Sequence, residues 1–106
     1  MPVHKTVSNF IKLNKVAVFS KSYCRFCNLA KSILYEAGEK YPAVMELDKL
    51  DNGREIQEAL TEISNSKTVP CVYINHKFVG GSSDVQRLFD TGELLEMLKA
   101  SQLKDD

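Results

Sequence analysis

One stretch decides how this chain folds: VAVFSKSYCRFC, residues 16–27. The apolar run VAVF is typical of a buried strand, and a helical pattern of apolar residues follows the motif Cys24-Arg25-Phe26-Cys27. Cys24 therefore lies where a strand passes into a helix, at free N–H groups and the positive end of the helix dipole, which favour a thiolate. Cys27 comes three positions later, the neighbour spacing on a helix, so the two sulfurs are close enough to bond. A strand, a C-x-x-C and a helix in this order indicate a thiol–disulfide redox site.

Length and composition limit what the chain can be. A chain of 106 residues is long enough for one core, and we expect a single domain over residues 1–106. The 14 lysines and arginines balance the 14 aspartates and glutamates, so no charged field points to nucleic acid or a membrane surface as partner. No apolar run reaches the length of a membrane span, and the first residues lack the apolar region of a signal peptide. Three cysteines fit a reducing compartment better than a disulfide framework, so we expect a cytoplasmic protein.

Apolar periodicity predicts the order helix, strand, helix, strand, helix, strand, strand, helix, helix. We expect strands at 16–19, 43–47, 71–74 and 77–79, and helices near 3–11, 24–37, 53–63, 85–89 and 93–100. A strand–helix–strand unit implies a parallel pair, and a tight turn between the last two strands implies an antiparallel pair. The economical arrangement is a mixed four-stranded sheet flanked by about five helices, the α/β thioredoxin-like fold, with the cysteines at the carboxyl end of a strand.

Two details of these elements can be checked. Asn52 and Glu55 are spaced as a capping box for the third helix, and its buried face should consist of Ile56, Ala59, Leu60 and Ile63. The tight turn contains Asn75-His76 in place of the common Asn-Gly, so His76 must adopt a positive φ.

The two cysteines of the motif should have different roles. Cys24 is the candidate nucleophile, with Lys21 and Arg25 as nearby cations that favour its thiolate, and the more buried Cys27 is the candidate resolving thiol. Two alternatives are half of a zinc site and a pair of cysteines without a chemical role. A zinc site needs about four ligands, and only Cys71 and two histidines remain, so redox chemistry is favoured. Cys71 itself is either a small apolar strand residue or a regulatory thiol.

Thr68-Val69-Pro70 comes just before a predicted strand. A proline at a strand edge leaves the backbone N–H and C=O of Val69 free to bind an extended peptide. A cis Val69–Pro70 bond would turn the chain sharply towards the cysteines, but the sequence does not decide between cis and trans.

Gly80-Gly81-Ser82-Ser83-Asp84 combines a flexible turn with a helix start. Serine and aspartate at such a place cap the helix in most proteins. The functional alternative is that the exposed N–H groups bind a carboxylate while Asp84 pairs with an ammonium group.

In their order and spacing these motifs resemble those of the glutaredoxins. The resemblance rests on Lys21 three residues before Cys24, the C-x-x-C, Thr68-Val69-Pro70, and the Gly-Gly-x-Ser-Asp segment that ends at Asp84. It runs from about residue 3 to residue 100. The resemblance implies a glutathione-dependent oxidoreductase that reduces protein–glutathione mixed disulfides and protein disulfides. Glutathione would be its co-substrate, and proteins bearing such disulfides its partners, with the chain itself a monomer.

The resemblance also implies how glutathione would be bound. Lys21 would bind the glycine carboxylate, helped by Gln57 and Lys67, and Val69 would bond the cysteinyl backbone. Ser83 and Asp84 would hold the γ-glutamyl end. The groove would be completed by Phe26, Thr68, Pro70 and Gly81.

The motif departs from the family's usual Cys-Pro-Tyr-Cys at two positions. Arg25 replaces the proline and adds a permanent charge, from which we expect a lower pKa of Cys24 than in a proline variant. Phe26 replaces the tyrosine and loses a hydroxyl group. Some family members without that proline bridge a [2Fe-2S] cluster between two subunits, so cluster binding through Cys24 and glutathione is the alternative function.

Overall fold

Four strands and five helices follow one another over residues 2–104, the part of the chain that the computed structural model describes, with side chains described over residues 2–100. Their order agrees with the sequence expectation, apart from a short 3₁₀ turn, η1, that follows the second strand. The elements are α1 (Val3–Leu13), β1 (Val16–Ser20), α2 (Arg25–Glu36), β2 (Ala43–Glu46), η1 (Leu47–Lys49), α3 (Gly53–Ser64), β3 (Cys71–Ile74), β4 (Lys77–Gly80), α4 (Ser82–Thr91) and α5 (Glu93–Lys104).

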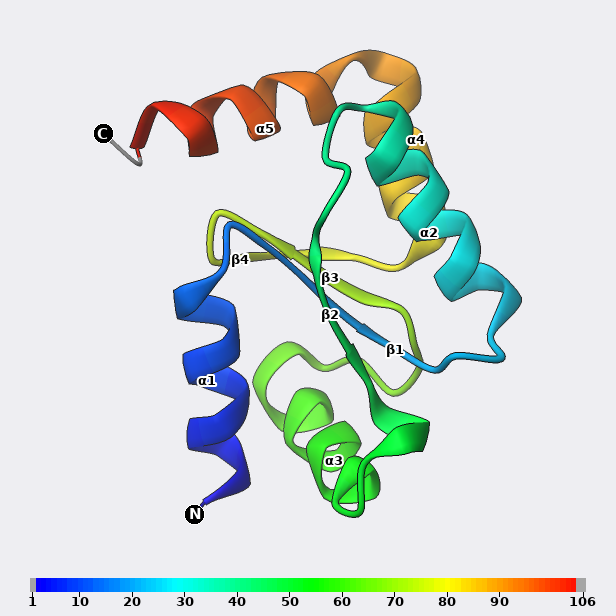
Figure 1. Ribbon diagram of the computed structural model, residues 1–106, viewed down its shortest axis with the longest axis vertical. Coiled ribbons are helices and arrows are strands. Elements are labelled where there is room, and N and C mark those ends of the chain that lie inside the picture. Colours follow the sequence, from blue (N-terminus) through cyan, green and yellow to red (C-terminus); the bar gives the residue numbers. More distant parts are fainter. Residues whose placement is uncertain (1, 105–106) are drawn as a thin grey trace.

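The strands form one mixed sheet in the order β2-β1-β3-β4. β1 pairs parallel with β2 and antiparallel with β3, and β3 pairs antiparallel with β4. Because α2 carries the crossover between the parallel strands, the loop that contains Cys24 lies at the carboxyl end of β1, as open α/β sheets place their ligand sites. The expected mixed four-stranded sheet with helices on both faces is confirmed (Figure 1).

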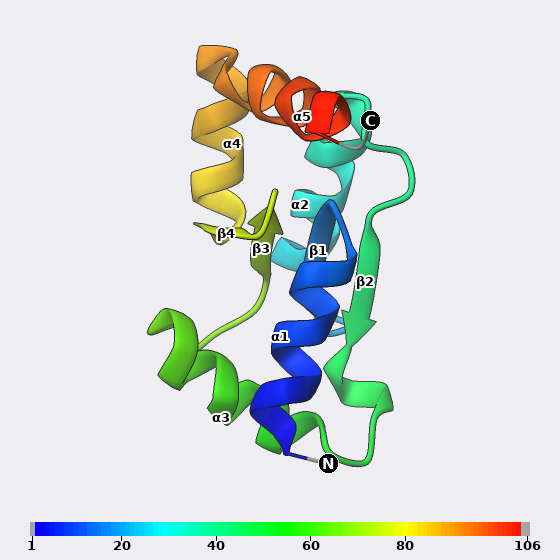
Figure 2. The ribbon, with the colours of Figure 1, turned by 90° about the vertical axis from the view of Figure 1, so that its left-hand side faces the viewer.

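The two faces of the sheet carry separate cores, which follow from the alternation of side chains along β1. Val16 and Val18 point to one face, where they pack with buried residues of α2, α4 and α5. Ala17 and Phe19 point to the other face, where they pack with buried residues of α1, η1 and α3. Figure 2 shows α1 and α3 below α2, α4 and α5 in the turned view. A strand that is buried on both faces must be apolar throughout, which is why VAVF is such a strong signal.

The capping box expected at the start of α3 is absent. Asn52 has φ −103° and ψ 25°, far from the extended backbone of a typical N-cap, and its side chain makes no capping hydrogen bond. The chain enters α3 from η1, and Gly53 packs so tightly there that a Cβ would lie 1.9 Å from the Leu47 carbonyl oxygen. This close approach, rather than a capping side chain, fixes the start of the helix.

Ile63 was expected on the buried face of α3 and is 44% exposed. The other three residues of that face, Ile56, Ala59 and Leu60, are buried as expected. In the last turn Ser64 faces the sheet, where its hydroxyl hydrogen-bonds with that of Tyr73 on β3. The buried stripe therefore ends one turn early, and Ile63 lies at its margin.

The connections next to the site have special backbone geometry. Asn75 and His76 both have positive φ, 55° and 70°, so the expected tight turn is confirmed. The Val69–Pro70 peptide bond is cis, one of the two states that the sequence left open.

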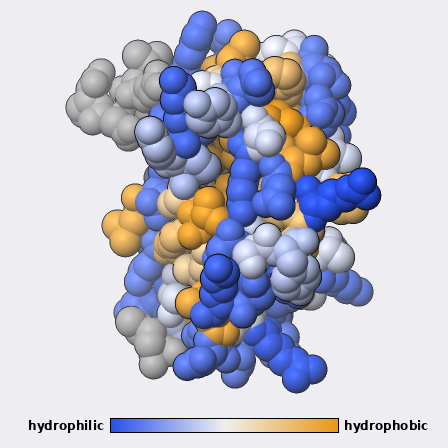
Figure 3. Space-filling model, turned by 45° about the vertical axis from the view of Figure 1, so that its right-hand side comes forward, coloured by the Kyte–Doolittle hydropathy of each residue, from blue (hydrophilic) through white to orange (hydrophobic). Residues whose placement is uncertain are grey.

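On the face seen in Figure 3, hydrophobic residues reach the surface as separate patches between hydrophilic ones. No helix over the described residues is long and apolar enough to cross a membrane.

Candidate active site

Cys24 is the N-cap residue of α2. Its backbone is extended, with φ −85° and ψ 119°, and its Sγ accepts a hydrogen bond from the Cys27 N–H at 3.4 Å. Partial burial raises the pKa of the Cys24 thiol, but hydrogen bonds from Cys27 and from the Phe26 N–H, with the charge of Lys21, outweigh it and leave that pKa below its usual value. The free N–H groups of the helix start therefore stabilise the thiolate, as the sequence predicts for this position.

Cys27 differs from Cys24 in both exposure and acidity. Cys27 lies in the first turn of α2, and it is fully buried. Burial raises the pKa of the Cys27 thiol, and the neighbouring Cys24 sulfur raises it further. The pair thus combines an accessible thiol of lowered pKa with a buried thiol of raised pKa. All three cysteines are free thiols.

The two cations near the motif contribute unequally. The Lys21 ammonium helps to lower the pKa of Cys24, whereas Arg25, exposed in the first turn of α2, makes no contribution of comparable size. The loop that leads to Cys24 is held by a separate contact, because Asp48 accepts hydrogen bonds from the Ser22 N–H at 2.8 Å and the Ser22 hydroxyl at 2.5 Å. These two bonds hold the pKa of the Asp48 carboxyl below its usual value. Asp48 is separated from Ser22 by 26 positions, and no sequence pattern connects the two.

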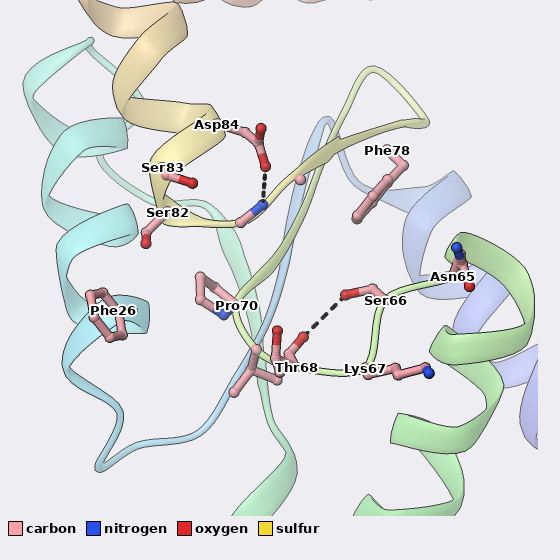
Figure 4. A pocket seen from close by; sticks show the side chains of 13 residues that line it. Phe26, Asn65, Ser66, Lys67, Thr68, Pro70, Phe78, Ser82, Ser83 and Asp84 are labelled. Carbon is pink, nitrogen blue, oxygen red and sulfur yellow. Dashed lines mark hydrogen bonds between the residues drawn. The ribbon is translucent and has the colours of Figure 1, made fainter.

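A pocket of about 530 Å³ runs from Phe26 along the segment that contains the cis proline to the start of α4. Figure 4 shows Phe26 at one end, Pro70 in the middle and Phe78 with Asn65 at the opposite end. It brings together eight of the residues that the resemblance implied: Phe26, Lys67, Thr68, Val69, Pro70, Gly81, Ser83 and Asp84. Two further lining residues, Gly80 and Ser82, belong to the Gly80–Asp84 segment that the sequence singled out, and three lie outside every expected motif: Asn65, Ser66 and Phe78.

Asp84 caps α4 and forms an ion pair with Arg87 on the same helix. Its Oδ2 accepts the Gly81 N–H at 3.0 Å, which caps α4, and its Oδ1 accepts Arg87 Nη1 at 3.1 Å. The Gly81 N–H, followed by Arg87, holds the pKa of the Asp84 carboxyl below its usual range. The carboxylate is thus kept charged and fixed at the edge of the pocket. Gly80 makes room for it, since a Cβ there would lie 2.2 Å from Oδ2.

The opposite wall of the pocket is the segment from Asn65 to Pro70. The carbonyl of Ser66 accepts hydrogen bonds from Thr61 Oγ1 at 2.9 Å and Gln57 Nε2 at 3.4 Å, and these tie the segment to α3. The Ser66 hydroxyl donates to the Thr68 carbonyl at 3.1 Å. Within residues 2–104, the backbone N–H and C=O of Val69 have no hydrogen-bond partner, so both remain available to a ligand in extended conformation.

Lys21 and Gln57 do not line this pocket. They lie together in a second hollow of about 460 Å³, whose other lining residues are Tyr23, Leu47, Asp48, Gly53, Arg54 and Glu58. The resemblance had grouped these two residues with Lys67, which lines the first pocket. The Gln57 side chain connects the two hollows, because its amide reaches the Ser66 carbonyl in the pocket wall. Arg54 is a cation in the second hollow that the sequence analysis did not single out.

Comparison with known proteins agrees with this geometry. A family model described as Glutaredoxin matches residues 16–79, from β1 through β4. The chain belongs to the glutaredoxin family. It is 44% identical over 103 residues to Glutaredoxin-C4 of Arabidopsis thaliana, covering 97% of this chain and 73% of the relative. It is 38% identical to the mitochondrial Glutaredoxin-2 of Mus musculus, where 96% of this chain spans 62% of the mouse protein.

A solved structure agrees as well. The buckwheat glutaredoxin–glutathione complex superposes with a TM-score of 0.90 at 32% identity, over 94% of this chain and 90% of that one. This glutaredoxin therefore has the thioredoxin-like fold. Its activity is that of a glutathione-dependent thiol–disulfide oxidoreductase.

Proposed function

We propose that Cys24 is the nucleophile of this oxidoreductase and Cys27 its resolving thiol. The observation that supports this assignment is the contrast within the pair. The accessible Cys24 thiol, at the N-cap of α2, has a lowered pKa, and the buried Cys27 thiol has a raised one. Attack requires the thiolate, so at neutral pH the accessible sulfur is the more reactive of the two.

The reaction then proceeds by two exchanges that conserve electrons. The Cys24 thiolate attacks the glutathione sulfur of a mixed disulfide, the protein thiolate leaves, and glutathione stays bonded to Cys24. A second glutathione thiolate attacks that bond, glutathione disulfide leaves, and the Cys24 thiolate is restored. With a protein disulfide, Cys24 forms a mixed disulfide with the protein and Cys27 attacks it, which closes the Cys24–Cys27 bridge and releases the reduced protein. Two glutathiones then reduce the bridge.

We infer that glutathione lies along the pocket between Phe26 and Asp84. The free N–H groups at the start of α4, including that of Ser83, suit the γ-glutamyl carboxylate, and the Asp84 carboxylate suits its ammonium group. The unpaired backbone groups of Val69 suit the cysteinyl amide, with Phe26, Thr68, Pro70 and Gly81 as walls.

The glycine carboxylate of glutathione then has three candidate partners in two places. Lys67 lines the pocket itself, whereas Lys21 and Gln57 lie in the second hollow. The three candidates are not equivalent, since Gln57 already donates to the Ser66 carbonyl. Replacing each lysine in turn with glutamine and measuring the KM for glutathione distinguishes the two places.

A glutathione-coupled reduction assay tests the assignment of the cysteines. We expect Cys24→Ser to abolish reduction of a glutathione mixed disulfide and Cys27→Ser to retain it, because that route needs no resolving thiol. Reduction of a protein disulfide should require both cysteines. Activity of Cys24→Ser on the mixed disulfide would refute the nucleophile assignment.

The alternative role, a [2Fe-2S] cluster held by Cys24 and glutathione between two chains, stays a prediction. Over the described residues no group of three or more His, Cys, Asp or Glu side chains could hold a metal ion, so a cluster would need ligands from a second chain and from glutathione. Protein purified without oxygen and with glutathione should then be brown and dimeric. A colourless monomer counts against the cluster.

We further propose that the chain acts as a monomer on glutathionylated or disulfide-bearing proteins in the cytoplasm, as part of electron transport and redox homeostasis. The three free thiols suit a reducing compartment. Fractionation of cells that express the protein tests the location, since recovery with mitochondria would contradict it.

A further inference from the structure

The far end of the pocket contains an aromatic ring that no step of the reaction uses. Phe78 on β4 is 43% exposed and lines the pocket at the end opposite Phe26 (Figure 4). Asn65 and Ser66 lie across from it at the same end. We call the region formed by Asn65, Ser66 and Phe78 the outer subsite.

The ring of Phe78 is held by a row of aromatic contacts that begins in the core. Phe19 on β1 meets Tyr73 edge-on with ring centroids 5.9 Å apart, and Tyr73 meets Phe78 at 5.3 Å. Tyr73 is only 4% exposed, and its hydroxyl hydrogen-bonds with Ser64. Phe78 therefore packs on a buried neighbour that is held by a hydrogen bond, and its exposed face is a preformed apolar surface. Binding a ligand on that surface then costs little conformational entropy of the protein side chains.

The register of the β3–β4 hairpin places this ring. Tyr73 pairs with Phe78 shortly after the tight turn, so the two side chains point to the same face of the sheet. A β-bulge follows, because Val72 pairs with Gly80 and Val79 is an extra residue on β4. Val79 packs against the core on the α2 side, so Phe78 and Val79 lie on opposite faces of the sheet.

Asn65 adds a polar group to the same end of the pocket. It ends α3 with a left-handed backbone, φ 56°, and is exposed. Its side-chain amide makes no hydrogen bond with residues 2–100, the part of the chain whose side chains the structure describes. An amide can both donate to and accept from a peptide backbone. An exposed ring opposite a free amide is a combination suited to a peptide segment with an apolar side chain.

We propose that the outer subsite binds the polypeptide of a glutathionylated substrate, with an apolar side chain of that polypeptide on Phe78 and its backbone on Asn65. The proposal rests on the proposed placement of glutathione, because the outer subsite and the glutathione groove are parts of one continuous pocket. Glutathione itself has two carboxylates, an ammonium and amide groups, and no apolar side chain to cover a ring. The polypeptide attached to it supplies one, and buried aromatic anchors contribute most to such contacts.

The test compares substrates with and without a polypeptide. Three mixed disulfides of glutathione are used: one with cysteine alone, one with a peptide that has leucines flanking its cysteine, and one with the same peptide carrying serines instead. For Phe78→Ala we expect kcat/KM for the leucine peptide to fall about tenfold, which is the effect of losing one well-packed anchor. The values for the cysteine and serine substrates should stay unchanged.

Two further variants separate binding from folding. Leu95→Ala on α5 removes an apolar side chain of matched exposure, 44%, away from the pocket, and should alter none of the three substrates. Asn65→Gly keeps the left-handed backbone and removes the amide, so both peptides should be affected and the cysteine substrate should not.

Three results would overturn the proposal. The first is an unchanged kcat/KM of Phe78→Ala for the leucine peptide, and the second is an equal fall for all three substrates. The third is a wild-type dimer that Phe78→Ala converts to a monomer, since the ring would then be covered by a second copy. Failure of the wild type to reduce the cysteine substrate would instead refute the proposed function.

Discussion

Replacing Gly80 with alanine should disturb the active site through Asp84. Gly80 has φ +130°, a conformation that disfavours any side chain. A Cβ at this position would lie 2.2 Å from Asp84 Oδ2, 2.6 Å from its Cγ and 2.9 Å from its Cβ. The clash therefore involves the whole Asp84 side chain, including the Cβ that is fixed to α4, and rotation of the carboxylate alone does not relieve it.

The size of the effect can be worked out from two contributions. An alanine at this φ costs about 1–3 kcal/mol of backbone strain. Displacing Asp84 also breaks the bond from the Gly81 N–H at 3.0 Å, and a hydrogen bond to a charged group contributes about 1.5–3 kcal/mol. The free energy of unfolding should therefore fall by roughly 2.5–6 kcal/mol, against a total of about 5–15 kcal/mol for a domain of this kind, so over most of that range the variant is folded in the absence of urea.

Gly38→Ala is the matched control. Gly38 also has positive φ, +106°, but no heavy atom lies within 4 Å of the Cβ it would gain. It follows α2 at the end of the helix remote from Cys24. This variant should lose only the strain contribution, about 1–3 kcal/mol, and should keep wild-type activity.

Urea unfolding and a glutathione-coupled assay together test the reasoning. We expect Gly80→Ala to be less stable than Gly38→Ala by about 1.5–3 kcal/mol with an unchanged m-value. Its kcat/KM for a glutathione mixed disulfide should fall about tenfold or more, because Asp84 is the partner that we propose for the γ-glutamyl ammonium. Equal stability of the two variants, or wild-type kcat/KM in Gly80→Ala, would refute the role of Gly80 in positioning Asp84.

Three further predictions concern titration and reactivity. Lys21→Gln should move the pH midpoint of Cys24 alkylation upwards, and Arg25→Gln should move it less; a larger shift for Arg25→Gln than for Lys21→Gln would contradict this order. Burial, followed by the nearby Cys71 thiol, raises the pKa of Tyr73 to about 12, above about 10 in the unfolded chain. The neutral Tyr73 phenol therefore contributes its full stability below pH 10, and this contribution is lost between pH 10 and 12. Over that window the free energy of unfolding should fall by about 2–3 kcal/mol more in wild type than in Tyr73→Phe. Parallel curves of unfolding free energy against pH for the two proteins would contradict this. Cys71 is fully buried, its Sγ contacts the Ser66 hydroxyl at 3.1 Å, and burial raises the pKa of its thiol. The Cys71 thiol should therefore resist alkylation until the protein unfolds, and Cys71→Ala should remain active.

The alternation of apolar residues carried most of the information about the fold. VAVF at residues 16–19 predicted a strand that is covered on both faces, and the structure has a core on each side of it. The Asn75-His76 turn required positive φ in sequence and has it in structure. The sequence-based expectation was wrong at the start of α3, which depends on packing against another segment. The spacing of Asn52 and Glu55 looked like a capping box, but the approach of Gly53 to the Leu47 carbonyl determines the start of α3.

The active site, like the fold, has some features that follow from local sequence and others that depend on the packing of distant segments. That Cys24 lies at a helix start follows from local pattern, and so does its thiolate character. Two other features do not follow from local pattern: the hydrogen bonds from Ser22 to Asp48 and the position of the Phe78 ring. Each depends on residues that the folded sheet brings together. The separation of Lys21 and Gln57 from the Phe26–Asp84 pocket was likewise not predictable from spacing along the chain.

The sequence by itself determined the order of the elements, the place of Cys24 at a helix start and the family of the chain. These properties depend on short-range periodicity and on motifs whose chemistry is local. The tertiary structure alone decided the cis state of Pro70, the fixation of the Asp84 carboxylate above Gly80, and the aromatic row from Phe19 to Phe78. Each of these depends on how distant segments pack against one another, and packing geometry is a property of the folded chain rather than of any stretch of its sequence.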